Sequence, residues 1–124
     1  MSTEVNYKEL EPRIFSLRFW VSTVEPGEIK QAFNRIMKLT NYNILDFTEY
    51  TFPVQGYTAI WLLAESHLAV HTFPGNKWSY VELSGCNEQK TIEFKQLLVN
   101  SDFKISWEDQ QPHQSFPGKI VSSV

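Results

Sequence analysis

Two apolar runs separated by a short polar break constrain the fold more than any other part of the sequence. Residues 57–63 (YTAIWLL) and 67–73 (HLAVHTF) are rich in β-branched and aromatic residues, which favour strands. The break at residues 64–66 is too short for a crossover connection, so the two strands are expected to pair as an antiparallel hairpin. A second hairpin is predicted to follow, because Pro-Gly-Asn-Lys at residues 74–77 is a strong turn sequence and residues 78–83 return as a strand.

Further strands and two helices are predicted on either side of this double hairpin. Residues 14–23, 43–52 and 103–107 are predicted to be strands. Apolar residues at helical spacing predict one amphipathic helix of about three to four turns; they are Ile29, Ala32, Phe33, Ile36, Met37 and Leu39. Asn87 can cap a second helix, which carries Ile92, Phe94, Leu97 and Leu98.

The order of these elements, β-α-β-β-β-β-α-β, predicts a single α+β domain over residues 1–124. The hairpins require an antiparallel sheet, and both helices are expected to pack on one of its faces. The other face is expected to be apolar and uncovered within the protomer. We therefore expect a partner protomer to cover it, so that two sheets pack across a homodimer into an αββα sandwich.

Composition and charge exclude several classes of partner. The formal net charge is −3, and acidic and basic residues are interspersed, so no nucleic-acid partner is expected. The longest apolar stretch, residues 59–64, is too short to span a bilayer, and no membrane partner is expected. Residues 1–13 (MSTEVNYKELEPR) do not resemble a secretory or transit signal.

The cysteine and histidine content bears on the compartment and on metal binding. A single cysteine, Cys86, cannot form an internal disulfide, which suits a reducing cytoplasm. The three histidines, His67, His71 and His113, lack a supporting pattern of cysteine or acidic residues. We therefore expect a cytoplasmic protein without a metal site.

A carboxylate, a hydroxyl and two imidazoles interrupt the first hairpin, in the segment LLAESHLAVHTFP of residues 62–74. A serine hydroxyl can attack the carbonyl of the preceding residue, here Glu65, and convert the peptide bond to an ester. If a base then removes the Cα proton of Ser66, elimination and hydrolysis leave an N-terminal pyruvoyl group. This chemistry needs a strained or polarised peptide, a donor for the oxyanion and a base of near-neutral pKa.

The sequence offers candidates for these parts, but their spacing leaves two interpretations open. His71 can supply the base, Thr58 the donor and Cys86 a soft acid. Each also has an ordinary structural interpretation, since serine favours turns, strand histidines are usually hydrogen-bonded and a lone cysteine commonly packs as a small apolar residue. In a regular strand Ser66 and His71 lie on opposite faces, because they are five residues apart and successive side chains alternate between the two faces. They can converge only if the chain bends near Ser66 or if the serine precedes the strand.

The segment GYTAIWLLAESHLAVHTFP, with Cys86 twenty residues after Ser66, resembles the short prokaryotic class of the S-adenosylmethionine decarboxylase family. That family carries Gly-x-Ser/Thr, then Glu-Ser-His, a hydrophobic residue and His-Thr-aromatic-Pro, followed by a cysteine. The matching positions here are Gly56, Thr58, Glu65, Ser66, His67, Leu68, His71, Thr72, Phe73, Pro74 and Cys86. The detailed resemblance covers roughly residues 50–86, and the flanking elements agree in type and order.

The resemblance implies self-cleavage of the Glu65-Ser66 bond. The products would be a β chain of residues 1–65 and an α chain of residues 66–124, which begins with a pyruvoyl group derived from Ser66. This group is the family's covalent cofactor. Its carbonyl forms a Schiff base with the amine of a small-molecule substrate and takes up the electrons released with carbon dioxide. The product is the aminopropyl donor for spermidine synthesis.

The resemblance also implies a role for other matched residues. His71 would be the processing base, and Thr58, where the family often has serine, the hydroxyl that assists cleavage. Cys86 would reprotonate the substrate carbon as a general acid. Phe52 and Phe73 match the aromatic positions between which the family holds adenine. The family forms (αβ)₂ dimers whose sheets meet and whose active sites draw on both protomers, in agreement with the uncovered face expected above.

The sequence departs from the family pattern around the expected substrate pocket. Gly75 stands where the family usually has a glutamate that resembles a ribose ligand, Phe73 replaces a tryptophan and Asn87 a glycine. Asp46 and Glu82 are further candidate partners for an amine or a ribose. Three functions therefore stay open: a decarboxylase of S-adenosylmethionine, a pyruvoyl-dependent decarboxylase of a basic amino acid such as ornithine or arginine, and an uncleaved paralogue that binds a ligand or regulates a partner.

Overall fold

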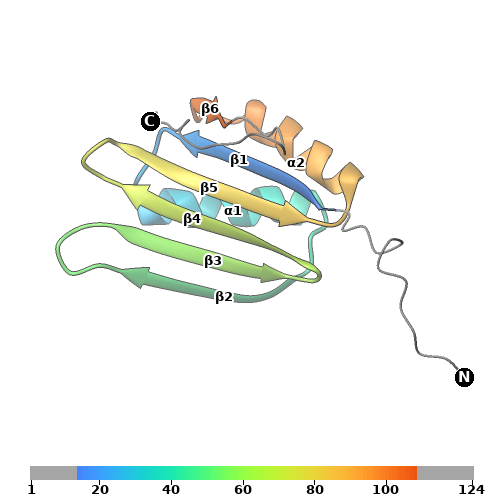
Figure 1. Cartoon of the computed structure of the whole chain (residues 1–124), viewed down its shortest axis with the longest axis horizontal. Helices are drawn as coiled ribbons and strands as arrows, with labels where there is room; N and C mark the ends of the chain where they lie inside the picture. The colour runs from blue at the N-terminus through green and yellow to red at the C-terminus, as the bar shows by residue number, and fades with distance from the viewer. Residues whose placement is uncertain (1–13, 109–124) are drawn as a thin grey trace, which may run out of the picture.

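The computed structural model describes residues 14–108, and its elements follow the predicted order (Figure 1). They are β1 (Phe15–Val21), α1 (Pro26–Leu39), β2 (Ile44–Thr51), β3 (Tyr57–Leu63), β4 (Ser66–Phe73), β5 (Trp78–Gly85), α2 (Glu88–Val99) and β6 (Ile105–Trp107). The strands form one six-stranded sheet in the order β2-β3-β4-β5-β1-β6. Every pairing in it is antiparallel, which confirms the predicted α+β class.

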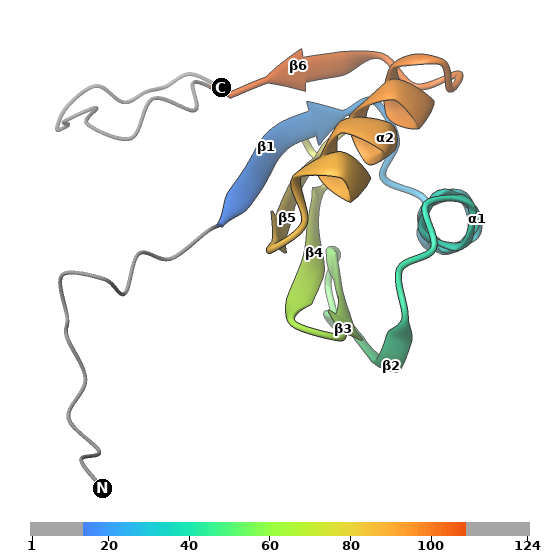
Figure 2. The same cartoon turned by 90° about the vertical axis from the view of Figure 1, so that its right-hand side faces the viewer.

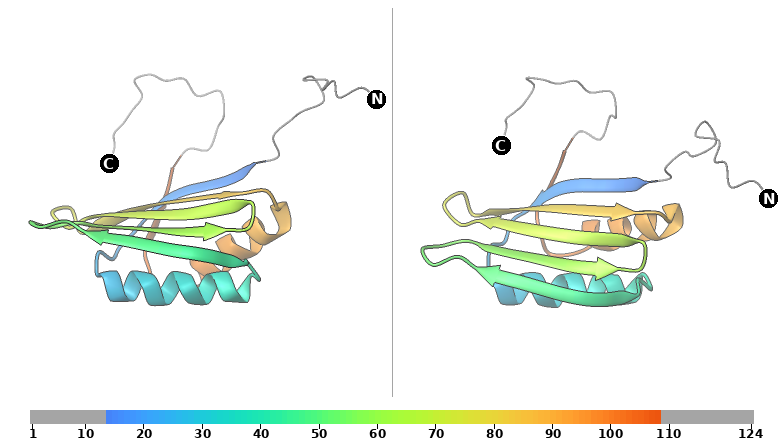
Figure 3. Two further views of the ribbon diagram at one scale, coloured as in Figure 1. Left: turned by 90° about the horizontal axis from the view of Figure 1, so that it is seen from below. Right: turned by 60° about the horizontal axis from the view of Figure 1, so that its bottom comes forward.

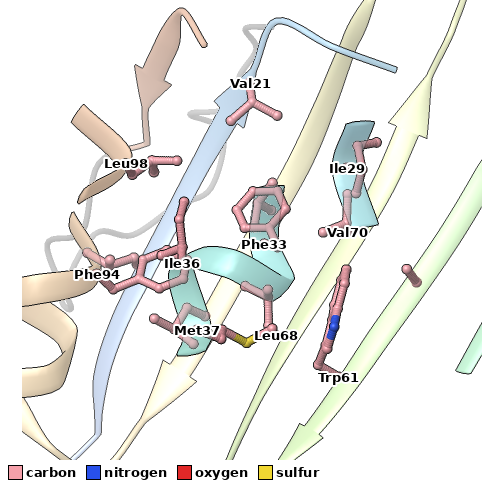
Figure 4. Close-up of a cluster of buried hydrophobic side chains, with 14 of the residues drawn as sticks. Val21, Ile29, Phe33, Ile36, Met37, Trp61, Leu68, Val70, Phe94 and Leu98 are labelled. Carbon is pink, nitrogen blue, oxygen red and sulfur yellow. The ribbon is translucent and has the colours of Figure 1, made fainter. Parts of the chain in front are cut away.

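Both helices lie on one face of the sheet, as predicted (Figures 2 and 3). The strands turn alternate residues toward them, so that β1 buries Leu17, Phe19 and Val21 and leaves the residues between them less buried. The helices fill the core with large side chains (Figure 4). The Phe33 ring of α1 stacks on Phe94 of α2, with centroids 6.2 Å apart and planes inclined by 10°. This shared apolar layer fixes the sheet against both helices.

The helix ends follow from local capping chemistry. Glu25 accepts a hydrogen bond from the backbone N–H of Glu28 at 2.7 Å, and Pro26 fits the first turn of α1 because that position needs no N–H donor. Asn87 caps α2 as predicted, since its side-chain oxygen accepts from the N–H of Lys90 at 2.9 Å. The cap at Asn87 directly follows Cys86, so it also fixes the backbone beside that thiol.

We expect Asn87→Ala to lower the free energy of unfolding by about 1 kcal/mol, the usual effect of losing an N-cap. Asn87→Asp keeps an acceptor at the start of α2 and should retain most of the stability. Urea unfolding followed by circular dichroism measures the difference between the two variants. Equal stabilities of Asn87→Ala and the parent chain would contradict the capping role.

The face of the sheet opposite the helices is uncovered by any element in the described range (Figure 3). Its composition differs from the prediction, because it is mixed rather than apolar. Leu62 and Phe73 are exposed there at 49% and 45%, yet strand alternation puts His67, His71 and Glu82 on the same face. A partner that covers this face must therefore satisfy polar groups as well as bury apolar ones.

Two further findings concern residues 14–108. Neither described helix is long and apolar enough to cross a membrane. Within this range no three His, Cys, Asp or Glu side chains gather in a way that could hold a metal ion. His113 lies outside the described residues.

Candidate active site

Three of the candidate residues meet at the turn between β3 and β4. Ser66 is the first residue of β4 and pairs with Leu63, so Ala64 and Glu65 alone form the turn. The thiol of Cys86 donates a hydrogen bond to the carbonyl oxygen of Glu65, with a sulfur–oxygen distance of 3.1 Å. The Ser66 hydroxyl donates to the carbonyl of Ser84 on the neighbouring strand. We call Glu65, Ser66 and Cys86 the cleavage half-site.

The backbone of Glu65 is strained at this turn. Its φ angle is +64°, in the left-handed region that residues with a Cβ adopt only at a cost of roughly 1–2 kcal/mol. Its carbonyl belongs to the peptide bond with Ser66, so the strain adjoins the bond expected to break. The hydrogen bond from Cys86 draws electron density from the same carbonyl, which makes its carbon more electrophilic.

Thr58 and His71 form a second group on the uncovered face, which we call the histidine half-site. They are directly paired across β3 and β4, and Thr58 Oγ1 lies 3.1 Å from His71 Nδ1. This hydrogen bond fixes the orientation of the imidazole and leaves Nε2 for another partner. The pair has the composition of a base held by an orienting hydroxyl.

The structure does not bring the two half-sites together within one protomer. The β3–β4 register runs without interruption from Thr58–His71 to Leu63–Ser66, so neither a bend nor a bulge turns Ser66 toward His71. Five strand residues correspond to about 16 Å along β4. In addition, Ser66 shares the helix-facing side with the buried Leu68, whereas His71 faces away. The donor at the Glu65 carbonyl is therefore Cys86 rather than Thr58.

The two aromatic candidates lie at the same end of the sheet as the histidine half-site. Phe52 follows β2 and Phe73 ends β4, and both rings are exposed. Each has an aromatic neighbour, since Phe52 contacts Tyr50 at 4.9 Å and Phe73 contacts Trp20 at 5.6 Å between centroids. A Cβ built on Gly75 meets no atom within 4 Å, so the turn leaves open space where the family usually has a glutamate side chain.

A hollow of about 360 Å³ opens on the uncovered face beside the cleavage half-site, and its polar lining includes Arg18, His67 and Glu82. Glu82 accepts a hydrogen bond from the Tyr80 hydroxyl at 2.8 Å, and burial, followed by the Glu82 carboxylate, raises the pKa of Tyr80. Asp46 is elsewhere, on the edge strand β2, where it accepts from the N–H of Phe47. Only Glu82, of these two carboxylates, lines the hollow.

Sequence reasoning did not single out Tyr42, which the fold brings to the cleavage half-site. A Cβ built on Gly85 would stand 3.5 Å from three hydroxyl oxygens, those of Ser66, Thr91 and Tyr42. Burial raises the pKa of Tyr42, and the nearby Thr91 hydroxyl opposes this in part. Tyr42 and Ser66 come from elements far apart in sequence, so no spacing pattern could have paired them.

Three comparisons place the chain among known proteins. Residues 24–109 match the sequence profile of the family described as S-adenosylmethionine decarboxylase. The chain is 38% identical over 56 residues to the S-adenosylmethionine decarboxylase proenzyme of Prochlorococcus marinus strain MIT 9313, covering 45% of each chain. It is 34% identical over 73 residues to the proenzyme of strain MIT 9211 of the same species, covering 57% of this chain and 59% of that one. The matched segments thus span about half the length of these curated relatives.

The crystal structure of the adenosylmethionine decarboxylase from Aquifex aeolicus VF5 has a similar fold. The two superpose with a TM-score of 0.62, over 87% of this chain and all of the other, at 16% sequence identity. This likeness concerns the fold alone. The family match covers both helices, both half-sites and every strand except β1, because it begins between β1 and α1 and runs past β6.

Proposed function

Because the chain belongs to the S-adenosylmethionine decarboxylase family, we propose that it is the precursor of a decarboxylase that cleaves itself between Glu65 and Ser66. The observation that carries this proposal is the hydrogen bond from the Cys86 thiol to the Glu65 carbonyl, at a residue with strained backbone. If Ser66 had only a structural role, neither the hydrogen bond to the Glu65 carbonyl nor the strained backbone of Glu65 would be needed. Cleavage would divide the single domain into chains of residues 1–65 and 66–124.

Self-cleavage follows from the chemistry of the cleavage half-site. The Ser66 oxygen adds to the carbonyl carbon of Glu65, and the charge that develops on the carbonyl oxygen is stabilised by the Cys86 thiol. The Ser66 proton moves to the amide nitrogen as the C–N bond breaks, which leaves an ester. Removal of the Ser66 Cα proton then breaks the Cβ–O bond and releases Glu65 as a carboxylate. Water then hydrolyses the dehydroalanine that elimination leaves at residue 66 and releases its nitrogen as ammonia. The new chain begins with a pyruvoyl group.

The residues at the turn fit this prosthetic group, because Ser66 follows the scissile carbonyl directly and Cys86 contacts that carbonyl. Once formed, the pyruvoyl group supplies an electrophilic carbonyl that takes up the electrons released with carbon dioxide. Cleavage converts the Glu65 carbonyl to a free carboxylate. Cys86 then remains beside the new chain end, where its thiol can deliver a proton to the substrate carbon.

We propose that the processing base comes from a second copy of the chain. The pair of Thr58 and His71 is complete and oriented but lies about 16 Å along the strand from Ser66, on the opposite face. A homodimer that joins the uncovered faces would carry His71 of one copy toward the cleavage half-site of the other. The mixed composition of that face is consistent with an interface that also contains catalytic groups.

The proposed substrate is S-adenosylmethionine, and the proposed product is the aminopropyl donor for spermidine synthesis in the cytoplasm. The family match supports this choice over a basic amino acid. Phe52 and Phe73 are exposed aromatic rings that can stack on adenine. Gly75 removes one carboxylate from this region, so we expect the ribose to be held by fewer hydrogen bonds than in relatives that carry the glutamate.

Two measurements on one purified preparation test the proposed function. Denaturing mass spectrometry after long incubation should show two fragments divided at residues 65 and 66, in place of a chain of 14.5 kDa. The cleaved protein should release labelled carbon dioxide from carboxyl-labelled S-adenosylmethionine. Release from ornithine or arginine alone would favour the amino-acid alternative, and a chain that stays intact would favour the non-catalytic paralogue.

We expect Cys86→Ala to separate the two proposed roles of the thiol. Loss of one hydrogen bond to the Glu65 carbonyl should slow self-cleavage by roughly 10-fold. Loss of the proton donor should lower the decarboxylation rate of the cleaved protein by about 10²–10⁴-fold. Cleavage is followed by mass and turnover by labelled carbon dioxide. Wild-type turnover by cleaved Cys86→Ala protein would exclude the thiol as the acid.

A further inference from the structure

The Tyr42 hydroxyl is the one buried side-chain nitrogen or oxygen in residues 14–108 that has no hydrogen-bond partner. Buried polar groups are nearly always paired, because an unpaired group loses its bonds to water without compensation. Tyr42 is 9% exposed and follows the C-terminal turn of α1. Lys90 Nζ lies 5.4 Å from the centre of the Tyr42 ring, a cation–π contact that helps to hold the ring in place.

The neighbours of this hydroxyl include the nucleophile of the proposed cleavage. The oxygens of Tyr42, Ser66 and Thr91 each lie 3.5 Å from the position that a Cβ on Gly85 would take, so no two of them are farther apart than twice that distance. The Thr91 hydroxyl donates to the carbonyl of Asn87 at 2.9 Å, and the Ser66 hydroxyl donates to the carbonyl of Ser84. Of these three hydroxyl groups, only that of Tyr42 donates to no acceptor.

We infer that the Tyr42 hydroxyl donates a hydrogen bond to the Ser66 oxygen during self-cleavage, a role that rests on the proposed function. In the uncut chain the Ser66 oxygen is neutral and already engaged with Ser84. When the ester eliminates, this oxygen leaves as part of the Glu65 carboxylate and becomes negatively charged. A donor placed beside it stabilises that charge and so accelerates the breaking of the Cβ–O bond.

The environment of Tyr42 suits a donor of this kind. Burial raises its pKa, so the phenol keeps its proton throughout the physiological range. Gly85 lets the backbone of β5 lie close to both oxygens, because a Cβ at this position would already contact each of them at 3.5 Å. The phenol is also unsatisfied before the reaction, so the bond to the charged oxygen replaces none that must first be broken.

The first test is Tyr42→Phe in freshly translated precursor, followed by mass against time. We expect cleavage to slow by about 10- to 100-fold, the effect of one lost hydrogen bond to a charged oxygen. Because the loss falls on elimination, the ester should accumulate. Hydroxylamine should then cut it to give an α chain that begins with serine instead of a pyruvoyl group.

A second readout separates this role from a structural one. In the uncleavable Ser66→Ala background, Tyr42→Phe should raise the melting temperature, because it removes an unsatisfied buried hydroxyl and keeps the ring. A residue that merely supports the fold would lower both stability and cleavage. Tyr57→Phe is the matched control, because its hydroxyl donates to Glu49 at 2.6 Å and it lies at the opposite end of β3 from Leu63, which pairs with Ser66. Its cleavage rate should be unchanged.

Gly85→Ala gives an independent test that does not depend on the folding of Tyr42→Phe. The added methyl group would contact both the Ser66 and the Tyr42 oxygens at 3.5 Å and hinder their approach to each other, so cleavage should slow. Combined with Tyr42→Phe it should add little further slowing, since both changes remove the same hydrogen bond. Unchanged cleavage in either single variant would overturn the assignment of Tyr42 while the wild-type chain still cuts itself. A wild-type chain that stays uncut would overturn the proposed function and this inference together.

Discussion

Replacing Ser66 with alanine is expected to leave every molecule as an uncut chain of about 14.5 kDa without decarboxylase activity. Alanine has no oxygen to attack the Glu65 carbonyl, so neither the ester nor the pyruvoyl group can form. The loss should be complete rather than partial, because no neighbouring nucleophile follows the scissile carbonyl directly. Mass spectrometry and release of labelled carbon dioxide measure the two losses in the same sample.

The matched control for this variant is Ser84→Ala. It removes a neighbouring hydroxyl on β5 but keeps the backbone carbonyl that accepts the hydrogen bond from Ser66, so cleavage should continue. Ser66→Ala should also stay folded, since its side chain makes one hydrogen bond at the edge of the core. Decarboxylation by folded, uncut Ser66→Ala protein would contradict the proposal that activity requires a pyruvoyl group derived from Ser66.

Removing the imidazole at position 71 is expected to slow cleavage by about 10²–10⁴-fold, the usual contribution of a general base. The structure adds a specific expectation about which chain supplies that base. Since His71 lies far from Ser66 of its own protomer, a mixture of His71→Ala and Ser66→Ala chains should cleave where neither does alone. The fragments should come only from the His71→Ala chain, which a small mass tag identifies.

A helper chain that carries both substitutions provides the control for this mixing experiment. It can form the same dimers but offers no imidazole, so it should not restore cleavage of the His71→Ala chain. Failure of the single-substituted helper as well would place the base within one protomer. Rapid cleavage by His71→Ala protein alone would instead remove His71 from the reaction.

Much of the fold followed from the sequence because it depends on local patterns. The strand of residues 57–63 and the turn at residues 74–77 lie where alternation and turn residues predicted them. The second helix was predicted less completely. Phe94 and Leu98 are buried in the core, but Ile92 is 44% exposed and Thr91 is buried in its place. Which side of a weakly amphipathic helix faces the sheet is decided by packing, which the pattern of α2 does not reveal.

The parts of the site that the sequence could not predict depend on contacts between distant segments. The pairing of Thr58 with His71 follows from the hairpin register, which the two strands specify. The contact of Cys86 with the Glu65 carbonyl depends on how β5 ends beside the first hairpin. The left-handed backbone of Glu65 was equally hidden, because glutamate has no preference for that conformation and the tight turn imposes it.

The strand order has a consequence for the protein after it is cut. The proposed chains alternate in the sheet, since β2 and β3 of the first are followed by β4 and β5 of the second, then β1 of the first and β6 of the second. Separating the fragments would therefore require breaking the hydrogen bonds of three strand pairings, β3–β4, β5–β1 and β1–β6. The two cleavage fragments are therefore interleaved in one sheet, so we expect them to stay associated and not to exchange with fragments of other molecules.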